Sequence, residues 1–150
     1  MKKYTVRVEI EKIIISGYEL DAVVRLIMPS SKMNGHSFEC FVPKDQDHFR
    51  KYGQVEVKFH LLDFNQKILE TQQKEIVAIK GRKNGTVNTY TVKGDIVAIS
   101  EHPRYMDSIQ IVIDCGIPIY TRAYKNQNFQ IGDYIEIEGR LDIYTTENEK

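Results

Sequence analysis

The sequence predicts an all-β protein built from two small antiparallel β-barrels in tandem, with one short helix. Apolar and polar residues alternate with a period of two in segment after segment, which is the pattern of half-buried strands. The periodicity of amphipathic helices is nearly absent. The charge balance changes near Asn84-Gly85, and this change divides the chain of 150 residues into predicted domains at 1–83 and 86–150.

In the first predicted domain the alternation indicates strands at about residues 4–15, 18–28, 36–43, 54–64 and 74–80. Three of these strands have clear inward-facing sets: Tyr4, Val6, Val8 and Ile10; Leu20, Ala22, Val24 and Leu26; and Val55, Val57, Phe59 and Leu61. The stretch 44–52 breaks the alternation, with Asp45 placed to cap a helix and Gly53 placed to end it. We therefore expect the short helix at 44–52.

In the second predicted domain strands are expected at about residues 87–100, 108–114, 117–125 and 132–144. Asn84-Gly85 is the strongest hairpin-turn signal in the chain and would join 74–82 to 87–92. The segment after Tyr144 is a poor fifth strand. Three alternatives follow: the second barrel is incomplete, strand 74–80 completes it, or the fold is a different one.

The order of these elements resembles the OB-fold, a small five-stranded β-barrel. In the first domain the resemblance rests on a long first strand, a hairpin, a short helix and a fourth strand that starts at a glycine. In the second it rests on three runs: Val92-Lys93-Gly94-Asp95-Ile96-Val97, Ile109 to Asp114, and Ile131 to Leu141. A glycine inside the first run allows a long strand to bend across a barrel. The resemblance implies oligonucleotide binding on the face of strands two and three.

Several functional classes are not indicated. The apolar runs are far shorter than the roughly 20 residues of a spanning helix, and the N-terminus has no apolar signal region, so we expect a cytoplasmic protein without a membrane segment. Cys40 and Cys115 lie in separate strand-like runs and are expected to be buried thiols. The four histidines have no metal-ligand spacing, and the motifs of common catalytic and nucleotide sites are absent. We expect neither cofactor, metal nor catalysis.

The charges of the two halves are opposite although the whole chain is neutral. Residues 1–85 hold 15 basic and 11 acidic residues, whereas residues 86–150 hold 6 and 10. The basic half can meet a polyanion, and the opposite charges can also pair the two halves or two copies of the chain. Surplus surface charge can equally serve solvation alone.

The most informative segment for function is residues 117–129. As a strand it directs Ile117, Ile119, Thr121 and Ala123 to one face and Pro118, Tyr120, Arg122 and Tyr124 to the other. The second face is aromatic and basic, which suits stacked bases and phosphates. The predicted nucleic-acid-binding residues are therefore Tyr120, Arg122, Tyr124 and Lys125, with Arg104 and Tyr105 from the preceding loop.

The leading functional hypothesis is a noncatalytic protein that binds single-stranded DNA or RNA. The alternative is a protein–protein interaction or assembly module, including a homo-oligomer, because tyrosine and arginine are also enriched at protein interfaces. Nearby outward-facing acidic residues, such as Glu136 and Glu138, count against a generic attraction for nucleic acid.

Overall fold

The computed structural model describes residues 4–43, 53–79 and 88–146, which form strands almost throughout. The nine strands are β1 (Val6–Ser16), β2 (Glu19–Leu26), β3 (Ser37–Val42), β4 (Gly53–Ile68), β5 (Glu75–Ala78), β6 (Thr89–Glu101), β7 (Ser108–Asp114), β8 (Pro118–Tyr124) and β9 (Tyr134–Thr145). Within the described ranges the helical structure is one 3-10 turn, η2 (Lys125–Gln127). The all-β prediction is confirmed. The helix expected at 44–52 and the Asn84-Gly85 turn lie outside the described residues.

No helix in the described part of the chain is long and apolar enough to cross a membrane.

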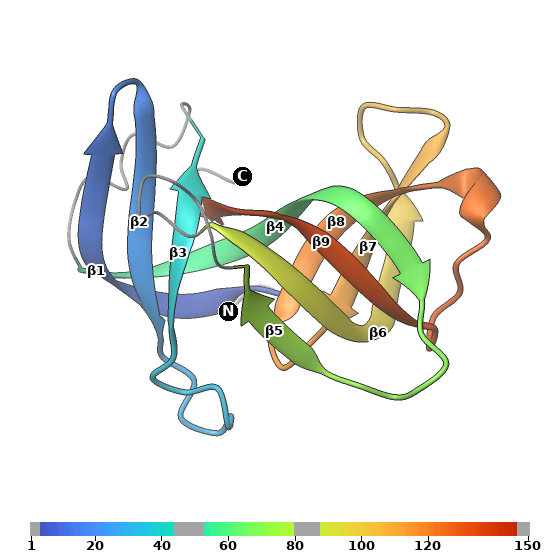
Figure 1. The fold of residues 1–150 in the computed structure, drawn as a ribbon, viewed down its shortest axis with the longest axis horizontal. Coiled ribbons are helices and arrows are strands. Elements are labelled where there is room, and N and C mark those ends of the chain that lie inside the picture. Colours follow the sequence, from blue (N-terminus) through green and yellow to red (C-terminus); the bar gives the residue numbers. More distant parts are fainter. Residues whose placement is uncertain (1–3, 44–52, 80–87, 147–150) are drawn as a thin grey trace.

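The strands form a closed β-barrel architecture with two hydrogen-bonded circuits (Figure 1). The first circuit runs β1-β2-β3-β9-β4 and closes by pairing β4 with β1. The second runs β4-β8-β7-β6-β9 and closes by pairing β9 with β4. The β3–β9 and β4–β8 pairings are parallel. The sheet is therefore mixed, and the prediction of an antiparallel architecture was wrong at these two pairings.

The long strands β4 and β9 belong to both circuits. β4 has 16 residues and β9 has 12, and each is long enough to pair with different neighbours at its two ends. The second circuit is completed by β4, which none of the three sequence-based alternatives named. Strand β5 instead adds to an edge of β6 over Tyr90–Lys93. The division at 1–83 and 86–150 stays a prediction, and strand pairings cross it at β3–β9, β4–β9 and β4–β8.

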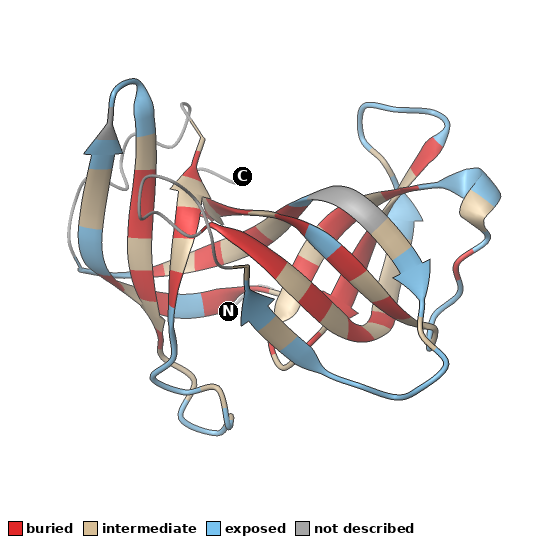
Figure 2. Cartoon of the chain, viewed as in Figure 1, coloured by how far each residue is buried: buried red, intermediate tan, exposed pale blue. Residues whose placement is uncertain are grey.

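One continuous hydrophobic core fills both circuits (Figure 2). Most of the predicted inward residues are buried, and Tyr4 and Leu20 are partly buried. The buried members from the predicted sets are Val6, Val8, Ile10, Ala22, Val24, Leu26, Val55, Val57, Phe59 and Leu61. Cys40 and Cys115 are free and buried, as predicted. Because the same faces of β4 and β9 serve both circuits, the core has no break between them.

Tyr90 of β6 ties the second circuit to strand β3 of the first. Its ring packs against Phe38 with ring centroids 5.8 Å apart. Its hydroxyl accepts a hydrogen bond from the backbone N–H of Glu39 and donates one to the carbonyl of Glu39, both at 2.9 Å. The Tyr90 phenol thus gives the backbone of Glu39 an acceptor for its N–H and a donor for its C=O, as a neighbouring strand does. Burial raises the pKa of the Tyr90 phenol.

Tyr90→Phe is expected to lower the free energy of unfolding by about 2 kcal/mol, because it leaves the N–H and the C=O of Glu39 without this partner. Urea unfolding measures the change. Tyr18→Phe is the matched control, because Tyr18 is 98% exposed and its substitution should change stability by less than about 0.5 kcal/mol. Equal effects of the two substitutions would contradict the bridging role of Tyr90.

Candidate nucleic-acid interface

Strand β8 presents its side chains in the alternation that the sequence pattern requires. Ile119, Thr121 and Ala123 are buried, whereas Tyr120 and Arg122 are half-buried and Tyr124 is exposed. The strand is held on both sides, antiparallel to β7 and parallel to β4. Thr121 adds a hydrogen bond from its Oγ1 to the carbonyl of Leu61, at 2.8 Å. The outward side chains therefore project from a strand with fixed backbone geometry.

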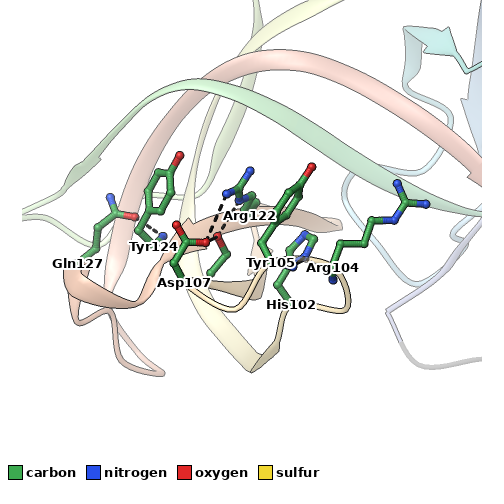
Figure 3. A network of polar contacts seen from close by, with 8 residues as sticks. His102, Arg104, Tyr105, Asp107, Arg122, Tyr124 and Gln127 are labelled. Carbon is green, nitrogen blue, oxygen red and sulfur yellow. Dashed lines mark hydrogen bonds and ion pairs between the residues drawn. The ribbon is translucent and has the colours of Figure 1, made fainter.

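Tyr124, Arg122 and Tyr105 form an aromatic–arginine row on the outer surface (Figure 3). The guanidinium carbon of Arg122 lies 3.9 Å from the ring centroid of Tyr105 and 5.0 Å from that of Tyr124. Both distances are within the range of cation–π contacts. Tyr105 is 47% exposed and Tyr124 is 49% exposed, so the row is accessible to a ligand.

Polar contacts fix the guanidinium of Arg122 in this row. Its Nε donates to Ser108 Oγ at 2.8 Å, and its Nη2 lies 3.7 Å from Asp107 Oδ1. Ser108 Oγ in turn donates to Asp107 Oδ1 at 3.0 Å. A guanidinium carries five N–H donors, so these contacts leave donors available for a phosphate.

His102 shapes the loop that carries Tyr105 and Arg104. Its Nδ1 accepts hydrogen bonds from the backbone N–H groups of Arg104, at 3.1 Å, and Tyr105, at 3.3 Å. The His102 ring also packs against the Tyr105 ring, with centroids 5.0 Å apart. The loop therefore holds Tyr105 between His102 and Arg122. The exposed side chain of Arg104 extends from the far end of this group (Figure 3).

Tyr120 lies on the same face of β8 but belongs to a different cluster. Its ring makes an edge contact with Tyr4, with centroids 6.4 Å apart, and Lys58 Nζ lies 5.4 Å from its centroid. Its neighbour on β4 is His60. The structure thus brings Tyr105, Arg122 and Tyr124 together and places Tyr120 in a packed group beside them.

Lys125 follows the row at the start of η2. Its Nζ forms an ion pair with Glu101 Oε2 at 3.0 Å, and its backbone N–H donates to Asp107 at 2.9 Å. Gln127 closes this end, because its side-chain oxygen accepts from the backbone N–H of Tyr124 at 2.8 Å. Lys125 therefore lies next to the row with its charge already paired.

Sequence reasoning missed the residues that position the row. Among the four histidines His102 has no metal-ligand spacing, and Asp107, Ser108 and Gln127 belong to no motif. A polar residue next to a predicted binding loop, such as Asp107-Ser108, is the signal that could have found them.

His60 is a partly buried histidine on β4 beside the Tyr120 cluster. Burial lowers its pKa to about 4, with further lowering by the nearby His102 and Lys58. Its ring makes an edge contact with Tyr144, at 6.1 Å between centroids. Asp142, its cross-strand neighbour, is bound by Arg140 through hydrogen bonds of 2.7 and 2.9 Å. The folded state thus favours neutral His60.

The protein is expected to lose stability in acid partly through His60. Because the pKa of His60 is lower in the folded state than its ordinary 6.5, its contribution is fully present above pH 6.5 and is lost as the pH falls towards 4. The loss in the free energy of unfolding is about 3 kcal/mol at the acidic end of this range. Urea unfolding measures the free energy of unfolding at neutral pH and near pH 4. The decrease between the two pH values should be smaller for His60→Gln than for the natural protein. Equal pH dependence of the two proteins would contradict this account.

The groups on this face suit a planar or anionic ligand. Exposed rings stack on π-systems, and the guanidinium interacts with both rings and anions. Among the residues that the structure describes, no group of three or more His, Cys, Asp or Glu is arranged to hold a metal ion.

Comparisons with known proteins show a distant structural likeness. No protein-family model matches the chain, and no curated protein matches it. One similar solved structure is the cytoplasmic molybdate-binding protein ModG with molybdate bound, at a TM-score of 0.44 and 8% sequence identity, covering 95% of this chain and 96% of that chain. This likeness is too distant to support an argument about function.

Proposed function

We propose that this chain is a noncatalytic protein that binds single-stranded nucleic acid through the aromatic–arginine row. The observation that carries the proposal is the exposed stack of Arg122 between Tyr105 and Tyr124 on a rigid strand. Rings and guanidinium planes are the groups on which unpaired bases stack in proteins that bind single strands.

Tyr124 is the main stacking platform in this proposal. Tyr105 has Arg122 and His102 as ring neighbours, whereas Tyr124 stands at the end of the row with Arg122 beside its ring. A base that stacks on Tyr124 extends the row by one planar group, and the contact is worth about 1 to 3 kcal/mol. Arg122 and the exposed Arg104 lie along the row and can meet backbone phosphates.

The acidic residues near the row set limits on affinity. Asp107 lies 3.7 Å from Arg122 and holds it in place, and it also reduces the positive potential at the row. We therefore infer a binding mode in which stacking contributes more than charge. This mode tolerates different sequences, because every base has a π-face.

The description of the two strand circuits as OB-like barrels in tandem is part of the same proposal. Each circuit closes with five strands, and β8 is the third strand of the second circuit when the circuit is counted from β6. Strands two and three carry the ligand face in OB-folds. The cytoplasmic location also stays a prediction.

Substitutions in the row are expected to separate stacking from charge. Tyr124→Ala should weaken binding to labelled single-stranded DNA or RNA by about 1 to 3 kcal/mol, because one stacked base loses its platform. Arg122→Ala should mainly reduce the salt dependence of the binding affinity, by the amount that corresponds to about one phosphate contact. Fluorescence anisotropy at several salt concentrations measures both effects. Tyr18→Ala is the control, because Tyr18 is another exposed tyrosine, at the β1–β2 turn. Equal weakening by Tyr124→Ala and Tyr18→Ala would argue against the row as the binding site.

The second candidate function is protein–protein interaction at the same surface. Met106 is 91% exposed beside Tyr105, and methionine, tyrosine and arginine are all enriched at protein interfaces. If Tyr124→Ala and Met106→Ala changed the oligomeric mass in solution while neither affected oligonucleotide binding, this function would replace the first.

A further inference from the structure

A shallow, open pocket lies beside the aromatic–arginine row, between the end of β6, the start of β7 and the segment that follows β8. Its cavity volume is about 370 Å³. Ile99 of β6, Ile109 of β7 and Phe129 provide its apolar walls, while Asn128 and Gln130 lie at its polar rim. Phe129 is buried, whereas Ile99 and Ile109 are only partly buried because they face this opening. We call this the mouth pocket.

We propose that the mouth pocket takes one unstacked nucleobase of the single strand that binds the row. This inference rests on the proposed function and deepens it by naming a second subsite. The pocket would add a preference for particular bases. A base in a pocket can form hydrogen bonds through its edge, whereas a stacked base is contacted only on its π-face.

The pocket combines the two kinds of surface that a base requires. The apolar side chains of Ile99, Ile109 and Phe129 fit the flat faces of a ring system. The side-chain amides of Asn128 and Gln130 each carry donors and an acceptor, which can pair with the polar edge of a base. Both residues are exposed, and Asn128 has a left-handed backbone conformation with φ of 54°. Asparagine tolerates that conformation better than most residues.

Lys125 links the row to the mouth pocket. It follows Tyr124 directly in the chain and also lines the pocket, so the two subsites share one boundary. Its Nζ is paired with Glu101, another lining residue, at 3.0 Å. The Lys125 and Glu101 side chains are both well exposed, so the pair can open at little cost. The phosphate that joins a base on Tyr124 to a base in the pocket then competes with Glu101 for the ammonium group of Lys125.

Methyl NMR of the full chain tests the proposal, with short dT, dC and dA oligonucleotides as probes. The δ1 methyls of Ile99 and Ile109 are expected to shift on titration, because a base in the pocket places an aromatic ring next to them. Their shifts should saturate at the same concentration as those of the Tyr124 ring protons, which aromatic NMR spectra of the same samples record. Glu101→Gln should tighten binding by about threefold and increase the salt dependence by about one contact, because Lys125 is freed.

Two further variants test the edge contacts without disturbing the core. Asn128→Gly keeps the left-handed conformation accessible and removes the amide, and Gln130→Ala removes the second amide from an exposed position. Each is expected to reduce the differences in affinity among the three oligonucleotides.

The outcomes separate this inference from the proposed function. Shifts at Tyr124 without shifts at Ile99 and Ile109 would overturn the pocket and leave the row as the binding site. Unchanged affinity in Glu101→Gln, together with unchanged base preference in both amide variants, would overturn the pocket as well. The absence of any shift with all three oligonucleotides would overturn the proposed function, and the pocket with it.

Discussion

Residues 1–83 and 86–150, produced as separate polypeptides, are each expected to lack a cooperative unfolding transition and to regain the fold when mixed. Two independent domains would each bury their own apolar strand faces, so at least the first half would fold by itself. The strand pairings lead to the opposite expectation. The first circuit needs β9, which pairs with β4 from Val57 to Ile68 and with β3 at Phe41. The second circuit needs β4, which lies between β8 and β9.

The loss of stability in each fragment is large, because each one loses a hydrogen-bonded neighbour strand and exposes part of its hydrophobic core. Without β9 the first fragment exposes the side of its core formed by Phe59 and Leu61, and without β4 the second exposes Leu141 and Ile143. Burial of such side chains contributes about 1.5 to 3 kcal/mol each, which is a large share of the stability of a small domain. NMR spectra of each fragment and of the equimolar mixture measure the effect. Dispersed spectra from either fragment alone would show that the halves are independent.

Gly94→Ala is expected to destabilise the protein by about 3 kcal/mol or more. A Cβ at this position would lie 2.2 Å from the carbonyl oxygen of Asp114 and 2.9 Å from the side chain of Ile113. Residue 94 lies in β6, next to the point where the strand changes its partner from β9 to β7. Backbone atoms cannot move aside as a flexible side chain can, so β6 and β7 must separate.

Thermal and urea unfolding of Gly94→Ala provide the measurement. Ser100→Ala is the control on the same strand, since Ser100 is exposed and its substitution should change stability by less than about 0.5 kcal/mol. A stable Gly94→Ala protein would mean that the two strands approach less closely than described.

The sequence predicted the strands well because each half-buried strand leaves a local pattern. Segment 18–28 corresponds to Glu19–Leu26, and segment 74–80 to Glu75–Ala78. The extension of β4 to Ile68 was missed, because its register shifts between Asp63 and Asn65 and the shift interrupts the alternation. Pairing between strands far apart in the chain, whether parallel or antiparallel, leaves no local pattern, so the sharing of β4 and β9 could not be predicted.

The candidate site could be predicted in part for the same reason. The alternation in β8 placed Tyr120, Arg122 and Tyr124 on one face, and burial in the structure follows that alternation. The contact of Tyr120 with Tyr4 and the support of Tyr105 by His102 depend on the folding of the chain around β8. The pairing of Lys125 with Glu101 joins the ends of β6 and β8, which no spacing in the sequence indicates.

The most direct test of the central claim is a binding titration of the full chain with labelled single-stranded DNA and RNA at low salt, followed by the same titration at rising salt. The account predicts saturable binding that weakens moderately with salt, because stacking on Tyr124 contributes alongside few phosphate contacts. Double-stranded DNA should bind more weakly, because its bases are not free to stack on the row. The absence of detectable binding to either single strand at low salt would contradict the claim.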